Sequence, residues 1–132
     1  MRKAVRAVKS SKGDGPYSQA IVSRGFVYVS GQGPLDPETG AIAGETIEEQ
    51  AELTLRNIQH IVEAAGASLA SVVKVTVFLS SMDDFERFNV VYRRFFQSPY
   101  PARTCVGCQL GAIMVEVDAI AELPEKREGA AE

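Results

Sequence analysis

The alternation of helix-type and strand-type hydrophobic patterns most constrains what this chain can fold into. The clearest helix pattern begins at Thr46, where Thr46-Ile47-Glu48-Glu49 forms a capping box. In such a box the threonine hydroxyl and the last glutamate satisfy reciprocal backbone N–H groups. Apolar residues then recur every three or four positions until Gly66, which favours a left-handed helix end. We expect one amphipathic helix over this range.

A second helix is expected from Ser81 to about Phe96. Pro99 and Pro101 follow it and stop it, because proline lacks an amide hydrogen and clashes with the preceding turn. Its apolar side is formed by Phe85, Phe88, Val91, Tyr92 and Phe95.

Strand patterns surround these helices. Residues 19–30 predict two strands around a tight turn at Ser23-Arg24-Gly25, and residues 71–79 are mostly β-branched. Two more strands are expected at 103–108 and 113–123, joined as a hairpin around Gly111.

The resulting order is strand, strand, helix, strand, helix, strand, strand, which predicts an α+β fold. Each helix connects two strands as a crossover, so the right-handed rule places both helices on one face of the sheet. The last strand still carries apolar residues on both faces, with Val115 and Val117 on one and Met114 and Ile120 on the other. An exposed apolar face needs a second cover, and we expect oligomerisation to provide it.

Composition narrows the class of protein. The 132 residues are 45% hydrophobic and 23% charged, as in a globular domain, so we expect one domain over 1–132 with a flexible tail from about 124 to 132. The net charge of −3 gives no reason to expect nucleic acid, and no apolar run is long enough to span a bilayer. With two cysteines and no secretory pattern at the start, we expect a reducing, cytoplasmic location.

The segment PARTCVGC, 101–108, contains both cysteines. On a strand, Arg103 and Cys105 point to one face and Cys108 to the other. A thioredoxin-like pair needs both sulfurs at the start of a helix, and a zinc site needs further ligands, so neither a redox pair nor a metal site is favoured. Cys108 is expected to be a small buried apolar residue.

Glu116 lies in the apolar stretch IMVEVDAIA. A buried carboxylate is either paired or has a raised pKa. One interpretation is a structural ion pair with Arg103 across the expected hairpin. The other is a polar pocket in which the arginine binds an anion and the glutamate transfers a proton. The residues alone leave both open.

Several long motifs together resemble the RidA family, also called YjgF or L-PSP, of reactive-intermediate imine deaminases. The resemblance covers nearly the whole chain, from about Gly15 to Ala121. The motifs are GPYSQA (15–20), VSGQGPLDPETG (29–40), EAAGAS (63–68), VVKVTVFLSSMDDFERFNVVY (72–92), PARTCV (101–106) and VEVDAIAE (115–122).

The resemblance implies a chorismate-mutase-like α+β fold with a mixed sheet, assembled as a homotrimer with pockets between subunits. It implies hydrolysis of enamine and imine intermediates, such as 2-aminoacrylate/2-iminopropanoate and 2-iminobutanoate, to 2-oxo acids and ammonia. Pyridoxal-phosphate-dependent dehydratases release such intermediates, which gives a functional link to those enzymes. No cofactor, metal, nucleic acid or membrane is expected to take part.

The family's functional positions transfer to individual residues of this chain. Arg103 would bind the substrate carboxylate, since a guanidinium suits bidentate capture. Glu116 would orient and deprotonate the attacking water, and Cys105, the third catalytic position, would line the pocket without acting as a nucleophile. The other substrate-binding positions are Tyr17, Ser30, Gly31 and Asn89.

Two departures from better-known members are visible. The hairpin tip at 110–112 is shorter, and the connection 97–102 looks short, so we expect substrate preference to differ more than reaction type. A trimeric regulatory protein that senses a small carboxylate without turning it over is the alternative from another class. A ribonuclease or translation inhibitor is disfavoured by the negative charge and the lack of a base-stacking motif.

Overall fold

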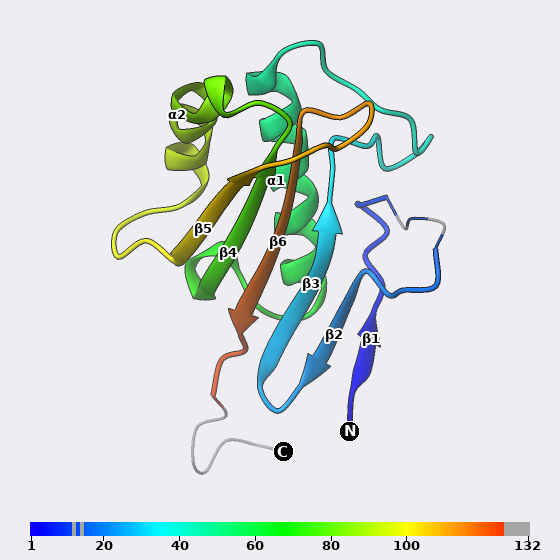
Figure 1. The fold of residues 1–132 in the computed structure, drawn as a ribbon. Helices are drawn as coiled ribbons and strands as arrows, with labels where there is room; N and C mark the ends of the chain where they lie inside the picture. Colours follow the sequence, from blue (N-terminus) through cyan, green and yellow to red (C-terminus); the bar gives the residue numbers. More distant parts are fainter. Residues whose placement is uncertain (12, 14, 126–132) are drawn as a thin grey trace.

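A mixed sheet with two helices on one face forms the frame of the protein (Figure 1). The computed structural model describes residues 1–11, 13 and 15–125, so most of the tail expected at 124–132 lies outside the described residues. Six strands make up the described sheet, in the order β1-β2-β3-β6-β4-β5. Only β4 and β5 pair in parallel. The strands are β1 (Lys3–Val5), β2 (Ala20–Ser23), β3 (Phe26–Gln32), β4 (Val72–Leu79), β5 (Ala102–Gly107) and β6 (Val115–Glu122).

Both helices lie on the same face of this sheet, as the crossover argument predicts (Figure 1). Helix α1 (Ile47–Ala64) connects β3 to β4, and α2 (Phe85–Phe95) connects β4 to β5. Single 3-10 turns, Leu69–Ser71 and Met82–Asp84, precede β4 and α2. The α+β class and the mixed sheet are therefore confirmed.

The ends of α1 follow from its sequence. The Thr46 hydroxyl accepts a hydrogen bond from the Glu49 amide at 3.1 Å, which confirms the N-cap. The Glu49 carboxylate, however, accepts from the amide of Glu45 at 2.8 Å, so the reciprocal bond of the expected capping box reaches one residue further back. Gly66, with φ of 94°, supplies the left-handed residue after the C-cap.

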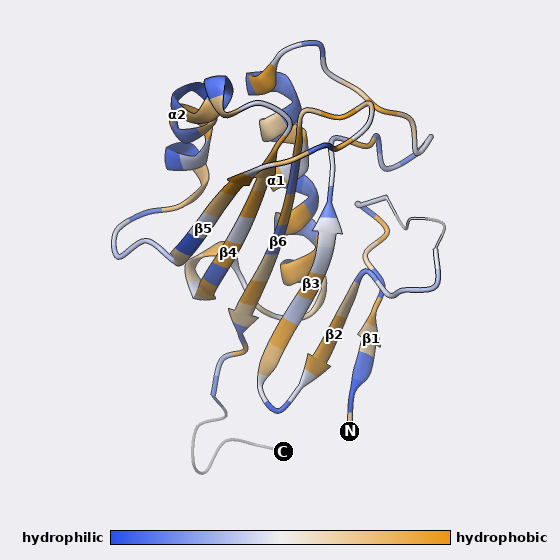
Figure 2. Cartoon of the chain, in the orientation of Figure 1, coloured by the Kyte–Doolittle hydropathy of each residue, from blue (hydrophilic) through white to orange (hydrophobic). Residues whose placement is uncertain are grey.

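The hydrophobic core fills the space between the helices and the covered sheet face. Figure 2 shows apolar residues concentrated along β3, β4 and β6. On β4 the buried residues Val75, Val77 and Leu79 alternate with half-buried ones, as a strand covered on one face requires. The largest fully buried side chains on the helices are Ile47, Leu55, Ile58, Ile61, Val62, Phe88 and Val91.

The β2–β3 hairpin turns at Arg24 and Gly25, which both have positive φ, at 51° and 85°. This two-residue turn confirms the hairpin expected from Ser23-Arg24-Gly25 and suits the right-handed strand twist. Strand β1, which adds to the outer edge of β2, was not predicted, because three residues between charged neighbours give no readable alternation.

The second face of the sheet is uncovered in the described chain. Phe26 and Tyr28 lie on it with ring centroids 6.4 Å apart, and Tyr28 is exposed. Phe78, Val106 and Ile120 belong to the same face, because they alternate with residues that point to the helices. An apolar face of this kind fits the expected need for a second subunit.

One prediction about the last two strands is wrong. Residues 102–107 and 115–122 do not form a hairpin, because β4 lies between them, parallel to β5 and antiparallel to β6. The hairpin was predicted because the two strands follow each other in the sequence. The α2 crossover instead places β5 at the edge of the sheet, next to β4. Cys108 is also not buried: it lies exposed just after β5.

No helix in the described part of the chain is long and apolar enough to cross a membrane.

Candidate active site

Arg103 points to the helix-covered side of the sheet. It is aligned with Val75 in the parallel β4–β5 pair, and Val75 faces the core. Its side chain therefore lies beside α2, at the edge of the sheet. Cys105, aligned with the core residue Val77, lies on the same side, as the strand alternation predicts.

Three side chains of α2 hold the Arg103 guanidinium. The Oδ1 atom of Asn89 accepts a hydrogen bond from Arg103 Nη1 at 2.8 Å. The guanidinium carbon lies 4.7 Å from the centre of the Tyr92 ring and 5.6 Å from that of Phe85. Both distances are within the range of cation–π attraction.

Arg103 has no ionic partner in the part of the chain that the structure describes, since none of its carboxylates lies within 4 Å. An arginine offers five N–H donors, and Asn89 accepts from only one nitrogen. The oriented guanidinium thus keeps donors for an anion. This is the arrangement that bidentate capture of a carboxylate requires.

Phe85 and Tyr92 were predicted only as core residues. The signal that could have found them is their spacing, because Phe85 is four residues before Asn89 and Tyr92 three after it, on one helix face. The Tyr92 hydroxyl is buried without a hydrogen-bond partner among the described residues, and burial raises the pKa of Tyr92 to about 12. The Tyr92 hydroxyl therefore stays protonated, and the residue contributes its aromatic ring to the contact with the Arg103 guanidinium.

A cleft of about 240 Å³ opens next to Arg103. It lies between α2 and the segment that leads into β5. Its lining residues are Asn89, Tyr92, Arg93, Tyr100, Pro101 and Arg103.

Cys105 borders this region without a nucleophile's properties. Burial raises the pKa of its thiol, although the nearby Arg103 charge acts in the opposite direction. A raised pKa keeps the sulfur protonated, and the thiolate is the reactive form. This agrees with a lining role.

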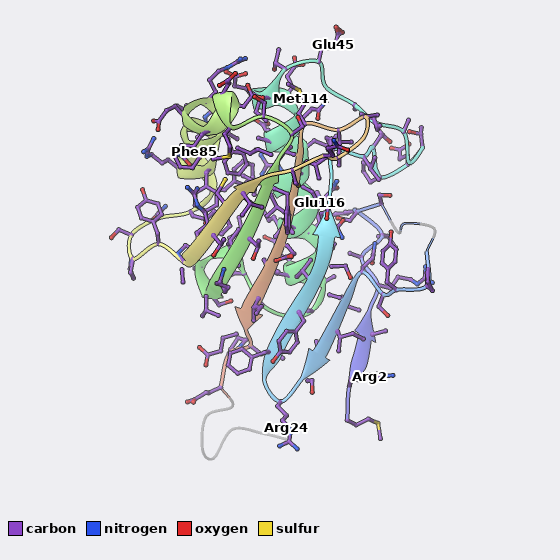
Figure 3. The ribbon with its side chains drawn as sticks, viewed as in Figure 1. Arg2, Arg24, Glu45, Phe85, Met114 and Glu116 are labelled. Carbon is purple, nitrogen blue, oxygen red and sulfur yellow. The ribbon has the colours of Figure 1, made fainter. Side chains whose placement is uncertain are left out.

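Glu116 faces the uncovered side of the sheet. It is aligned with Phe78 across the β4–β6 pair and lies beside β3 (Figure 3). Gly31 comes so close that a Cβ placed there would lie 3.0 Å from Glu116 Cδ. Burial raises the pKa of Glu116, and repulsion from the Asp118 carboxylate raises it further.

Ser30 precedes Gly31 on β3 and holds the segment that carries Tyr17. The Ser30 hydroxyl donates to the carbonyl of Ser18 at 2.6 Å, and its amide donates to the carbonyl of Gln19 at 2.9 Å. These bonds attach the segment that carries Tyr17 to β3, next to Gly31. Tyr17 itself is exposed.

Apart from Tyr17, the expected site residues form two separate groups in one chain. The arginine half-site consists of Asn89, Arg103 and Cys105, supported by Phe85 and Tyr92. The glutamate half-site consists of Ser30, Gly31 and Glu116, whereas Tyr17 lies beside Gly13 and Gly15, in a hollow next to β1.

The expected pairing of Arg103 with Glu116 is wrong within one chain, because the two side chains leave opposite faces of the sheet. Their alternation is set by β4: Arg103 is aligned with inward-facing Val75, and Glu116 with outward-facing Phe78. This also rules out an intrachain ion pair as the reason for Glu116. No group of three or more potential metal ligands occurs among residues 1–11, 13 and 15–125.

Comparison with known proteins places the chain in a family. The model of the family described as Endoribonuclease L-PSP matches residues 8–123. A RutC family protein of Pyrococcus abyssi is 46% identical over 86% of this chain and 91% of its own length. A Bos taurus protein named 2-iminobutanoate/2-iminopropanoate deaminase is 39% identical over 92% of this chain and 90% of its own length.

A solved structure gives the same result. The crystal structure of Escherichia coli TdcF with bound serine superimposes with a TM-score of 0.86 and 36% identity, covering 92% of this chain and 99% of that one. The chain therefore belongs to the RidA (YjgF, L-PSP) family.

Proposed function

We propose that this protein is a hydrolytic deaminase that converts small 2-imino acids, such as 2-iminopropanoate and 2-iminobutanoate, and their enamine forms to 2-oxo acids and ammonia. The observation that carries the proposal is Arg103, an oriented guanidinium without an ionic partner in the described chain, next to a cleft. The name of the bovine relative and the serine bound to TdcF support a small substrate with a carboxylate.

We further propose that the complete site is formed between subunits of a homotrimer. Arg103 and Glu116 leave opposite faces of the sheet, so a site that uses both needs a second copy of the chain. The uncovered face around Phe26, Tyr28 and Ile120 provides an apolar surface for that contact. The glutamate half-site of one subunit would then meet the arginine half-site of its neighbour.

The chemistry needs one water and a single proton-transferring group. Arg103 holds the substrate carboxylate and thereby positions the imine carbon. Glu116 from the neighbouring subunit takes a proton from water as the oxygen bonds to that carbon, and the C=N π electrons move to nitrogen. The glutamate returns this proton to nitrogen, which gives a carbinolamine. It then removes the hydroxyl proton and delivers it to the same nitrogen as the C–N bond breaks, so that ammonia leaves and the oxygen becomes the carbonyl. The raised pKa of Glu116 suits a group that both accepts and donates a proton.

The test uses an imine produced in place. A pyridoxal-phosphate-dependent threonine dehydratase releases 2-iminobutanoate in the presence of a trapping amine, and formation of 2-oxobutanoate is followed. Wild-type protein should accelerate this step, and Arg103→Ala should lower the rate roughly a hundredfold or more, because it removes a charged hydrogen-bonding partner. Arg94→Ala removes a cation from the same helix surface and serves as the matched control. Equal rates for wild type, Arg103→Ala and buffer would contradict the proposal.

Comparing wild type with Glu116→Gln distinguishes a deaminase from a sensor that binds a small carboxylate without turning it over. In a deaminase this variant keeps binding 2-oxobutanoate and loses turnover. A wild-type protein that binds 2-oxobutanoate and gives no turnover at all would instead be a sensor.

A further inference from the structure

A second arginine lines the cleft beside Arg103, and the proposed deamination of small imino acids gives it no role. Arg93 lies one residue after Tyr92 on α2, and it is exposed at the mouth of the cleft. Among the residues that the structure describes, the lining contains two arginines and no aspartate or glutamate. In a chain with a net charge of −3, this is a local concentration of positive charge.

Arg93 differs from the other arginines of the two helices in having no ion pair within the described residues. Arg94 lies 3.5 Å from Glu52, and Arg56 lies 3.9 Å from the same residue. Arg87 holds Glu48 through two hydrogen bonds, of 2.6 and 2.8 Å. Every other arginine of the two helices thus has a carboxylate partner among the described residues, and Arg93, where α2 borders the cleft, has none.

The two cleft arginines have different surroundings. Arg103 is half-buried and fixed by Asn89 and two aromatic rings, so it suits the carboxylate next to the reacting carbon. Arg93 is exposed and unrestrained, so it suits a charge at the far end of a longer ligand, where some freedom is needed. Tyr100, also exposed, lines the same cleft.

We propose that the Arg93–Arg103 cleft selects 2-imino and 2-oxo acids that carry a second anionic group, with Arg93 contacting the distal anion. The inference rests on the proposed function for the role of Arg103, and it adds the substrate class. Positive potential in a cleft raises the local concentration of anions, and a doubly charged ligand gains from it twice.

The experiment compares two stable 2-oxo acids of equal chain length, 2-oxoglutarate and 2-oxopentanoate, by isothermal titration calorimetry at low ionic strength. The readout is the ratio of their dissociation constants, which cancels effects common to both ligands. Wild-type protein should prefer 2-oxoglutarate by about fivefold, as one solvent-exposed charge contact allows. Arg93→Gln should abolish the preference, and 0.5 M salt should reduce it, because exposed charges are screened over about 10 Å at 0.1 M.

Arg94→Gln is the matched control, because it removes the same charge from the next residue of α2, away from the cleft. It should retain the preference. The inference is overturned if the wild type shows no preference, if Arg93→Gln retains it, or if Arg94→Gln loses it equally.

Turnover of 2-iminobutanoate, measured separately, distinguishes the two proposals. A preference for the dicarboxylate without turnover would contradict the proposed deaminase activity but not the proposed selectivity of the cleft. Turnover without a preference would contradict the selectivity alone.

Discussion

Arg103 and Glu116 leave opposite faces of one sheet, separated by strand β4. Arg103 is aligned with Val75, which points to the helices, and Glu116 with Phe78, which points away from them. Side chains fixed in this way by strand register cannot meet without rebuilding the sheet. A reaction that needs both must use two copies of the chain.

The first prediction is complementation between two inactive variants. Arg103→Ala and Glu116→Gln should each be inactive alone. When they are unfolded together in equal amounts and refolded, about one quarter of the sites in randomly mixed oligomers receive both intact residues, so activity should return to about that level. Turnover of 2-iminobutanoate before and after mixing measures it.

Mixing the two folded variants without unfolding provides the control for exchange of subunits. A double variant carrying both substitutions in one chain, refolded with wild type, shows how much intact chains alone contribute. Activity that never exceeds the sum of the separate variants would mean that both residues act within one chain or that one of them is dispensable.

The second prediction concerns the ring under the guanidinium. Tyr92→Phe keeps the ring 4.7 Å from Arg103 and removes only a hydroxyl that has no partner in the described chain, so binding of 2-oxobutanoate should not change. Tyr92→Leu removes the ring and should weaken binding roughly tenfold, because a shielded cation–π contact contributes about 1–2 kcal/mol. Calorimetric titration measures both.

Phe95→Leu is the matched control for Tyr92→Leu. Phe95 is also on α2 and lies 4.8 Å from a guanidinium, but that of Arg56, outside the cleft. Its substitution should change stability without changing the dissociation constant for 2-oxobutanoate. If Phe95→Leu weakens binding of 2-oxobutanoate as much as Tyr92→Leu does, the cause is a general loss of packing. If Tyr92→Phe weakens binding as much as Tyr92→Leu does, the hydroxyl is needed.

The third prediction is that Asp118 shifts the pH dependence of the reaction rate. Burial and then Asp118 raise the pKa of Glu116, and the glutamate must be ionised to accept a proton from water. The rate should therefore rise with pH through the raised pKa of Glu116. Asp118→Asn removes the repulsion and should move this acid limb to lower pH in a profile of kcat/KM. An unchanged limb, or one at higher pH, would contradict the assignment of Glu116 as the base.

The unfolding stability of Glu116→Gln gives an independent check of the same sign. A carboxyl whose folded pKa is raised contributes stability below its unfolded pKa, and that contribution is lost as pH rises through the folded pKa. The wild type should therefore lose stability relative to Glu116→Gln as pH rises through this range. Denaturant titrations at several pH values measure the difference.

Much of the fold could be predicted because its signals are local. The Thr46 cap, the Gly66 stop and the Arg24-Gly25 turn each depend on neighbouring residues, and each is confirmed. The position of β6 between β3 and β4 could not be predicted in the same way. It depends on pairings between strands far apart in the sequence, and the pattern of 103–108 and 113–123 fits a hairpin equally well.

The site shows the same division. Alternation along β5 correctly places Arg103 and Cys105 together, and helix spacing could have added Phe85 and Tyr92. Which residue faces Arg103 is not a property of its own strand. It depends on how β4 is aligned with β5 and with β6. For this reason the predicted contact between Arg103 and Glu116 is wrong within one chain.

The fourth prediction is that Gly31→Ala separates binding from turnover. A Cβ at residue 31 would meet the Glu116 carboxylate, which can move aside because it is the end of a flexible side chain. Gly31 is not among the glycines with positive φ, so alanine adds no backbone strain there. The variant should fold with a melting temperature close to that of the wild type, bind 2-oxobutanoate through Arg103 with at most a small loss, and lose turnover about tenfold or more as the base leaves its position. Gly25→Ala is no suitable comparison because its φ is 85°, whereas Ala64→Gly, at the exposed end of α1, lies away from both half-sites and should leave kcat unchanged. If Gly31→Ala turns over 2-iminobutanoate at the wild-type rate, the position of Glu116 against β3 does not matter for the reaction.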